Sequence, residues 1–282
     1  MARRLSQNAA FWTFLCGGFL IAAFGICLWG SSQGGRIAAQ NGWHCVYDPS
    51  ETLVGRSLQY LPHRVRMAFL NADLLPDGNV VRVEMKQRKV SREAIRTLTR
   101  FPGLCSVCLS GSDIDDDIAS ELLTLRHVPY FELASTRITD KTAMALNGLP
   151  SLEDVDLSAT MVTALGVNEL LQSGHVKNIR VSKCELRWKA IDWSTFSGVE
   201  FLDVSNSDFD DDALKQSSES AVSLNRLIAF GTRVSPTGIR QLAEKRRLLF
   251  LNIDRGLIEG SELEVLFPGC LLMLEDASVT RP

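Results

Sequence analysis

A short phrase of apolar residues recurs through most of this chain at a nearly constant interval. In each copy an apolar residue is followed by two variable residues, an apolar, a variable and an apolar residue, and then a small residue, as in Leu152–Thr160 and Val199–Ser207. The central apolar residues lie 23 to 25 residues apart, at Val83, Val107, Phe131, Val155, Ile179, Leu202, Leu227 and Leu251. Such a period predicts a solenoid, because about two dozen residues make one coil of strand, corner and short helix.

The pattern inside each repeat indicates which elements form the coil. Apolar and variable residues first alternate, as in a strand with one buried side. Helical spacing follows, as in Ile95, Leu98 and Phe101. Identical coils stacked in one direction pair their strands in parallel. The predicted fold class is therefore α/β, a solenoid with a parallel strand and a short helix in each coil of about 24 residues, over residues 80–275.

Two further positions keep the same register. A small side chain at the corner after the strand can satisfy inward-pointing backbone groups. These corner residues are Ser112, Thr136, Thr160, Cys184, Ser207 and Thr232. Good helix N-cap residues come three positions later, at Ser91, Asp115, Thr139, Thr163, Asp210 and Ser235. Pro236 then fits the first turn of a helix, whereas Arg187 breaks the capping pattern and predicts an irregular segment over residues 188–196.

These phrases resemble those of the leucine-rich repeat family. Leu133–Asp140 and Leu157–Thr163 are similar to bacterial members of the family with threonine in place of the usual asparagine. The resemblance covers residues 80–275 and implies the solenoid fold. It does not imply a particular ligand, because the family is defined by its scaffold residues.

The amino-terminal segment predicts a membrane anchor. Residues 9–30 carry no charge and at about 1.5 Å per residue can cross a hydrocarbon layer of about 30 Å as a helix. Trp12 and Trp29 lie near the two ends, where indoles are favoured. The alternative is a cleaved signal peptide, whose apolar region is usually shorter. An uncleaved anchor makes the chain resemble a bacterial membrane-anchored leucine-rich repeat protein.

The flanking charges predict the orientation of this anchor. Arg3 and Arg4 precede the span and only Arg36 follows closely, so residues 1–8 are expected in the cytoplasm and the repeats on the non-cytoplasmic side of a single-pass membrane protein. Residues 31–52 are predicted to be a linker, residues 53–79 an amino-terminal cap that covers the first coil, and residues 276–282 a carboxy-terminal tail.

The sequence offers no catalytic, cofactor or metal motif, and we predict that the chain is not an enzyme. Asp208, Asp210 and Asp212 imitate a calcium loop, but Ala213 stands where that loop needs glycine. Cys105 and Cys108 have the spacing of a redox or zinc motif but fall inside a strand phrase, where their side chains point in different directions. Nucleic acid is not an expected partner, because residues 113–156 hold ten Asp or Glu against three Lys or Arg.

The variable strand positions should form the concave face of the solenoid. Two groups stand out there. Asp156, Arg180 and Asp203 lie on consecutive coils and can form a charge ladder. The residues Phe201, Ile228, Phe230 and Phe250 form an apolar cluster, with Tyr130 on the same face. Exposed aromatic clusters often mark contacts, although residues 271–282 could instead fold over this one.

Two functions remain open on the sequence alone. The first is a membrane-tethered module for protein–protein recognition, which binds a protein or peptide through Tyr130, Asp156, Arg180, Asp203 and the apolar cluster. The second is a structural protein of the cell envelope without a specific ligand. A discrete aromatic and charged site on the concave face favours the first function, and a featureless face favours the second.

Overall fold

The computed structural model describes residues 43–47, 80–87 and 89–276. These residues divide into two compact units, one with residues 43–47, 80–83 and 100–104 and the other with the remaining described residues. The predicted membrane span (9–30) and the cap (53–79) lie outside the described residues, as does most of the predicted linker (31–52). Within that linker, β1 (His44–Tyr47) is a strand. No helix of the described part is long and apolar enough to cross a membrane.

The strands follow one another in the sheet in sequence order, as stacked coils require. They are β2 (Val80–Glu84), β3 (Ser106–Cys108), β4 (Tyr130–Glu132), β5 (Asp154–Asp156), β6 (Asn178–Arg180), β7 (Phe201–Asp203), β8 (Arg226–Ile228), β9 (Phe250–Asp254) and β10 (Leu271–Glu275). Every pair from β3–β4 to β9–β10 is parallel. The register sets the central apolar residues side by side, from Val107 opposite Phe131 to Leu227 opposite Leu251. The predicted parallel solenoid is confirmed over these coils.

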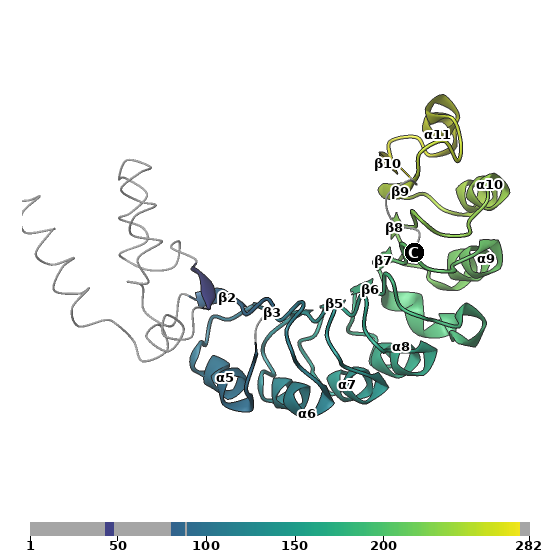
Figure 1. The fold of residues 1–282 in the computed structure, drawn as a ribbon. Helices are drawn as coiled ribbons and strands as arrows, with labels where there is room; N and C mark the ends of the chain where they lie inside the picture. Colours follow the sequence, from purple (N-terminus) through teal and green to yellow (C-terminus); the bar gives the residue numbers. More distant parts are fainter. Residues whose placement is uncertain (1–42, 48–79, 88, 277–282) are drawn as a thin grey trace, which may run out of the picture. The chain divides into compact units, whose positions relative to one another are not determined.

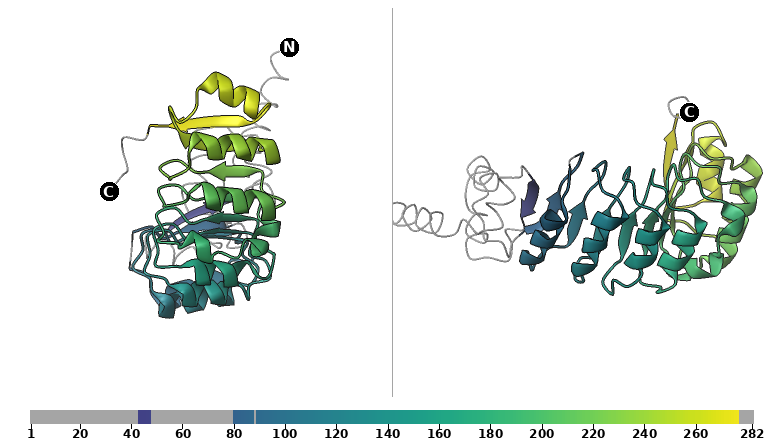
Figure 2. Two further views of the ribbon diagram at one scale, coloured as in Figure 1. Left: turned by 90° about the vertical axis from the view of Figure 1, so that its right-hand side faces the viewer. Right: turned by 60° about the horizontal axis from the view of Figure 1, so that its bottom comes forward.

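Short helices return the chain between the strands. They are α5 (Arg92–Thr97), α6 (Asp116–Ala119), α7 (Asp140–Leu146), α8 (Ala164–Leu171), α9 (Asp211–Ser220), α10 (Pro236–Lys245) and α11 (Gly260–Leu266), with the 3-10 helices η3 (Leu98–Arg100), η4 (Ser120–Thr124), η5 (Trp188–Ala190) and η6 (Trp193–Gly198). Within the larger unit the strands line the inner side of the curve and the helices its outer side (Figures 1 and 2). The central apolar residues lie between these layers and are at most 1% exposed.

The corner residues bond to the backbone as predicted. Thr136, Thr160, Ser207 and Thr232 donate to the carbonyl three residues earlier at 2.6 to 2.7 Å, and Ser112 donates to Met85 at 3.1 Å. Five of the six corner side chains are buried, and Ser207 is half-buried. The Cys184 thiol reaches back one coil and donates to the carbonyl of Leu157 at 3.1 Å. These bonds satisfy carbonyl groups that the corners would otherwise leave buried without a donor.

A left-handed backbone precedes each corner, which the sequence analysis did not predict. The residues with positive φ at this position are Gln87, Gly111, Ser135, Ala159, Lys183, Asn206 and Gly231. The N–H of most of them donates one coil onward, for example Ala159 to Ser182 at 2.8 Å and Asn206 to Phe230 at 2.9 Å. Only two of these seven residues are glycine, so no glycine signal repeats in the sequence.

The predicted N-caps are all confirmed. Ser91, Asp115, Thr139, Thr163, Asp210 and Ser235 each accept a backbone N–H of the first helical turn, and Pro236 is the first residue of α10. The capping residues also bond to the preceding helix. Asp116 accepts the N–H and hydroxyl of Thr139 at 2.9 and 2.7 Å. These bonds link neighbouring helix starts along one edge of the solenoid.

The irregular segment predicted after Arg187 is confirmed and consists of η5 and η6. Its aromatic side chains fill the core where a longer helix would lie. Trp188 stacks on Trp193 with ring centroids 6.1 Å apart, and its edge meets Phe209 at 4.8 Å. Both indoles are at most 5% exposed, so aromatic packing replaces the helical face of the other coils.

The last described strand bears on residues 271–275 of the segment that could fold over the concave cluster. Residues 271–275 form β10, which pairs in parallel with β9 and extends the sheet by one coil. Leu271 and Met273 are 67% and 48% exposed. Residues 271–275 therefore do not fold over the concave cluster, and residues 277–282 lie outside the described chain.

Candidate functional site: the concave strand face

Two columns of side chains line the concave face of the larger unit, on either side of the buried central residues. The register places Tyr130, Asp154, Asn178, Phe201, Arg226 and Phe250 in one column, and Glu132, Asp156, Arg180, Asp203, Ile228 and Asn252 in the other. Residues distant in sequence thus meet because neighbouring parallel strands are about 4.8 Å apart. The predicted site residues that belong to strands share these two columns, and Phe230 follows the end of β8 by two residues.

The centre of the face is a polar network that spans four strands. Asp154 on β5 accepts from Arg180 at 2.5 Å and from Asn178 at 3.2 Å. The side-chain amide oxygen of Asn178 accepts a hydrogen bond from Arg226 on β8 at 2.7 Å. The side chains of Arg180 and Asp154 are only 33% and 19% exposed. Each polar group therefore fixes the orientation of the next, and the two guanidinium groups are held in place on the surface.

Phe201 lies beneath these two cations. The guanidinium carbons of Arg180 and Arg226 lie over its ring, 4.9 and 5.2 Å from the centroid. As a result Phe201 is 8% exposed. The expectation that Phe201 is accessible is wrong, because the long arginine side chains cover the ring and gain cation–π contacts with it.

The charge ladder needs a similar correction. Asp156, Arg180 and Asp203 are neighbours in the register, as predicted, but the ion pair of Arg180 goes to Asp154. Asp156 instead accepts the N–H of Ser158 at 2.9 Å. Asp203 accepts the N–H and hydroxyl of Ser205 at 2.9 and 2.7 Å, and its burial raises its pKa above the ordinary value. Local turns hold both aspartates more closely than Arg180 does.

The register separates members of the predicted apolar cluster, because Phe250 lies opposite Arg226 whereas Phe230 follows the other end of β8. At the register position of Phe230 the five preceding coils have a serine or alanine, and the backbone bonds of the left-handed residues connect this column: Ser110, Ala134, Ser158, Ser182 and Ser205. Phe230 alone brings a large ring there and is half-buried, as are Ile228 and Phe250. Tyr130 is 40% exposed at the other end of the face. The sequence already contained this signal, since a column of small side chains is interrupted by the single aromatic ring of Phe230.

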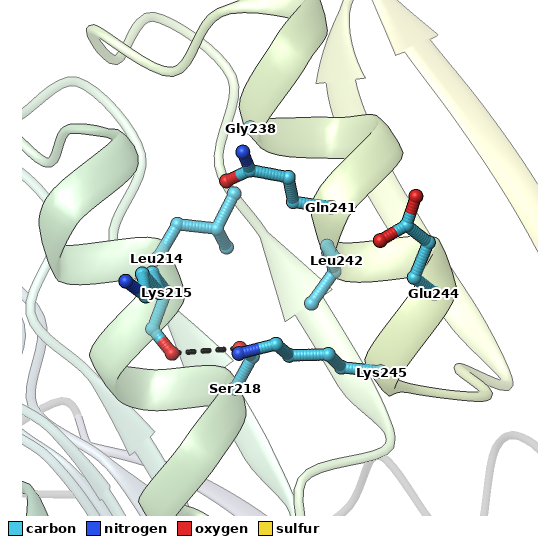
Figure 3. Close-up of a pocket in the computed structure, with 8 residues that line it drawn as sticks. All are labelled: Leu214, Lys215, Ser218, Gly238, Gln241, Leu242, Glu244 and Lys245. Atoms are coloured by element: carbon cyan, nitrogen blue, oxygen red, sulfur yellow. Dashed lines mark hydrogen bonds between the residues drawn. The ribbon is translucent and has the colours of Figure 1, made fainter.

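Apart from the concave face, a hollow lies on the outer side of the larger unit, between α9 and α10 (Figure 3). Its volume is about 230 Å³, and Leu214 and Leu242 form its apolar part. Ser218 bonds to the carbonyl of Lys215 at 2.7 Å, and Lys245 pairs with Glu219, which lowers the pKa of that carboxyl. Ser218 and Lys245 are thus engaged in bonds, and the hollow is smaller than the usual site for a small molecule.

The described residues show no cluster of side chains for metal binding. No three His, Cys, Asp or Glu side chains within the described ranges are arranged to hold a metal ion. Cys105 is exposed and Cys108 is buried. Burial, followed by a hydrogen bond with Glu132, raises the pKa of the Cys108 thiol. A raised pKa keeps this sulfur protonated, whereas redox and metal chemistry need the thiolate.

Comparisons with known proteins add similarity of fold only. No protein-family model and no curated protein sequence matches the chain. Similar solved structures include internalin C2 of Listeria monocytogenes, with a TM-score of 0.49 and 19% identity over 72% of this chain and 83% of that chain. An internalin (inlF) of the same organism has a TM-score of 0.46 and 17% identity over 69% and 52% of the two chains. A TLR13–ssRNA13 complex has a TM-score of 0.39 and 17% identity over 62% and 33%. With every TM-score below 0.5, these similarities carry no conclusion about partners.

Proposed function

We propose that this chain is a membrane-tethered recognition module of the leucine-rich repeat type, which binds a protein or peptide through its concave strand face. The observation that carries the proposal is Phe230. It places a half-buried ring where the five preceding coils have Ser or Ala, two residues after the half-buried Ile228. A scaffold role does not require a large side chain there, whereas aromatic side chains are common anchors of interfaces.

The polar network supplies the second part of the proposed site. Arg180 and Arg226 are already oriented by Asp154, Asn178 and the Phe201 ring. A partner would therefore meet fixed cations and lose less side-chain entropy on binding. In this proposal Phe201 positions the two arginines, while Tyr130, Phe230, Ile228 and Phe250 contact the partner and Asp156 and Asp203 contribute to orientation.

The experiment compares capture of a partner by three forms of the full chain. Wild type, Phe230→Ala and Val265→Ala are immobilised and exposed to extract of the cells that make the chain. Val265 is the matched control, because it is 79% exposed on α11, on the outer side. Loss of an anchor costs about 2 kcal/mol or more, so Phe230→Ala should lose at least about 90% of the captured protein.

Two results would contradict the proposal. Equal capture by Phe230→Ala and wild type, with unchanged circular dichroism, would remove the site from the concave face. If no protein is captured in a way that depends on the concave face, the structural role in the cell envelope is favoured. That alternative has its own support, since a long stack of coils can hold two surfaces apart without a ligand.

Tethering through residues 9–30 is part of the proposal and has a separate test. Its support is the uncharged run of 22 residues, which is long enough to span a bilayer. Mass spectrometry of the native protein should find residues 9–30 retained. A mature chain that begins between residues 31 and 41 would mean a secreted solenoid, and protease protection of the repeats in intact cells would reverse the proposed orientation.

A further inference from the structure

A groove lies on the edge of the solenoid where the chain passes from the strands to the helices. It measures about 800 Å³ and lies between the corner of residues 159–165 and the next coil, which contributes Lys183, Glu185, Arg187 and Ala190. These residues follow β5 and β6 and do not belong to the strands. The groove is therefore separate from the concave face, and its function does not depend on the function proposed above.

The backbone bonds on this edge do not join every pair of neighbouring coils, and one such bond is absent at the groove. In three other coils a backbone N–H on this edge donates to the preceding coil: Arg137 to Ile114 at 2.9 Å, Met161 to Ile138 at 3.1 Å and Arg233 to Phe209 at 2.8 Å. Asp113 and Asp208, at the same register position, make no such bond among the described residues. Glu185 holds the equivalent position in the coil after Met161. Among the described residues no such bond joins it to Val162.

The side-chain link between helix starts is interrupted at the same place. The first aspartate of a helix accepts the N–H of the next capping residue in the pairs Asp116–Thr139, Asp140–Thr163 and Asp211–Ser235. The first residue of α8 is Ala164, whose side chain has no hydrogen-bond acceptor. Arg187 stands where the next capping residue would be. The chain continues into η5 instead of an α-helix, and the edge stays open.

Part of the lining of the groove is apolar. Met161 and Leu165 are each 57% exposed, and Ala190 lines the opposite wall. The wall is fixed to α8 by Asn168, which donates to the carbonyl of Ala190 at 3.0 Å and accepts the N–H of Asp192 at 2.9 Å. Two large apolar side chains thus remain in solvent within a groove whose sides are held in place.

The rim of the groove is mostly basic. Lys183 and Arg187 are exposed, and within the described part of the chain neither forms an ion pair. The backbone of Lys183 is fixed by its left-handed conformation and by a bond to the carbonyl of Ser205 at 3.2 Å. Glu185 is the acidic residue of the lining. Asp140 nearby already accepts both groups of Thr163 at 2.6 and 2.7 Å.

We propose that this groove binds a short acidic peptide segment of a protein partner. An apolar side chain of the segment lies against Met161 and Leu165, and its carboxylates pair with Lys183 and Arg187. The argument is complementarity, since a partly apolar lining with a basic rim matches a peptide in which acidic residues flank leucine. Nucleic acid fits less well, because no aromatic side chain lines the groove to stack on a base.

The test uses a defined probe and the full chain. The probe is a fluorescein-labelled octapeptide of Asp and Glu with two central leucines, and binding is measured by fluorescence anisotropy at low salt. The double variant Lys183→Glu/Arg187→Glu should weaken binding at least about tenfold, and Leu165→Ser should weaken it by about threefold or more. Glu185→Lys should strengthen binding. Lys215→Glu, the same charge reversal at an exposed lysine of α9, should leave it within about twofold of wild type.

Several outcomes would overturn the proposal. One is absence of binding to wild type at millimolar probe, and another is equal weakening by Lys215→Glu and the double variant. A peptide with serines in place of the leucines that binds as tightly as the probe would mean attraction of charge alone. Another is that the wild-type chain binds anionic phosphatidylserine vesicles through Lys183 and Arg187 but does not bind the peptide. That result would assign the groove to a membrane surface. Phe230→Ala should keep full peptide binding, which separates this result from failure of the concave site.

Discussion

The hydroxyl of Thr160 donates to the carbonyl of Leu157 at 2.6 Å, and the thiol of Cys184 donates to the same carbonyl from the next coil at 3.1 Å. One buried acceptor thus receives a bond from its own corner and a bond from its neighbour. This arrangement joins two coils, and the loss of either donor changes how well the other alone satisfies the carbonyl of Leu157.

Thr160→Val should lower the free energy of unfolding by about 1 kcal/mol, because the buried Leu157 carbonyl loses its stronger donor but keeps the thiol. Cys184→Ala in the same chain removes the second donor, so the double variant should lose more than the sum of the single changes. Urea denaturation measures both. Thr99→Val is the control, because the Thr99 hydroxyl makes a similar bond at 2.7 Å on an exposed surface and should matter little. Strict additivity would show that the two donors act independently.

Gly231→Ala should destabilise the protein by about 2 kcal/mol or more, since it combines a left-handed backbone with a steric contact. The φ of Gly231 is +64°, and an added Cβ would lie 2.7 Å from Oδ1 of Asn206. Gly174→Ala is the matched control, because its φ is +69° with open space around the new atom. It should show the backbone cost alone. If both variants lose equal stability, the contact with Asn206 has no effect, and shortening that side chain in Asn206→Gly should then rescue nothing.

The sequence predicted the repeating parts of this molecule well because they obey one short period. Val155, Thr160 and Thr163 each follow from a single offset, and the structure confirms the core, corner and cap at these positions. The left-handed residue Ala159 was missed because it has no characteristic side chain. Its conformation is imposed by the bond to the next coil, which competes successfully with local preference.

The concave face was predicted less completely for a different reason. Strand alternation correctly places Asp156, Arg180 and Phe201 on this side. It does not say how far a long side chain reaches. Arg180 extends diagonally to Asp154 and covers Phe201. Which acceptor Arg180 pairs with depends on all the acceptors within its reach on three strands, and no single position in the sequence determines it.

Asp203 and Asp116 should give opposite dependences of stability on pH. Burial raises the pKa of Asp203 above the ordinary 3.8, so the folded chain binds that proton more tightly than the unfolded chain does. Its contribution to stability is present below the unfolded pKa and is lost as the pH rises through the folded pKa. Asp203→Asn should therefore be more stable than wild type near neutral pH, with the difference vanishing in acid.

Asp116 shows the reverse shift. Burial alone would raise its pKa, but hydrogen bonds from Thr142 and Thr139 outweigh burial and lower it. Its contribution is present above the unfolded pKa and is lost as the pH falls through the folded pKa. Asp116→Asn should thus be less stable than wild type near neutral pH and approach it in acid. Urea midpoints at about pH 7 and about pH 3 measure both variants, and the same sign for the two would contradict the assignment.

Phe201 and Tyr130 should separate a structural aromatic residue from a binding one on the same face. Phe201 is 8% exposed beneath two guanidinium groups, while Tyr130 is 40% exposed. Phe201→Ala should cost about 3 kcal/mol of unfolding free energy, because it removes a buried ring and frees Arg180 and Arg226 from their support. Tyr130→Ala should cost less than about 1 kcal/mol. If Phe201→Ala unfolds at the same urea concentration as wild type, the arginines do not need the ring, and Phe201 becomes available as the binding anchor that its strand position first suggested.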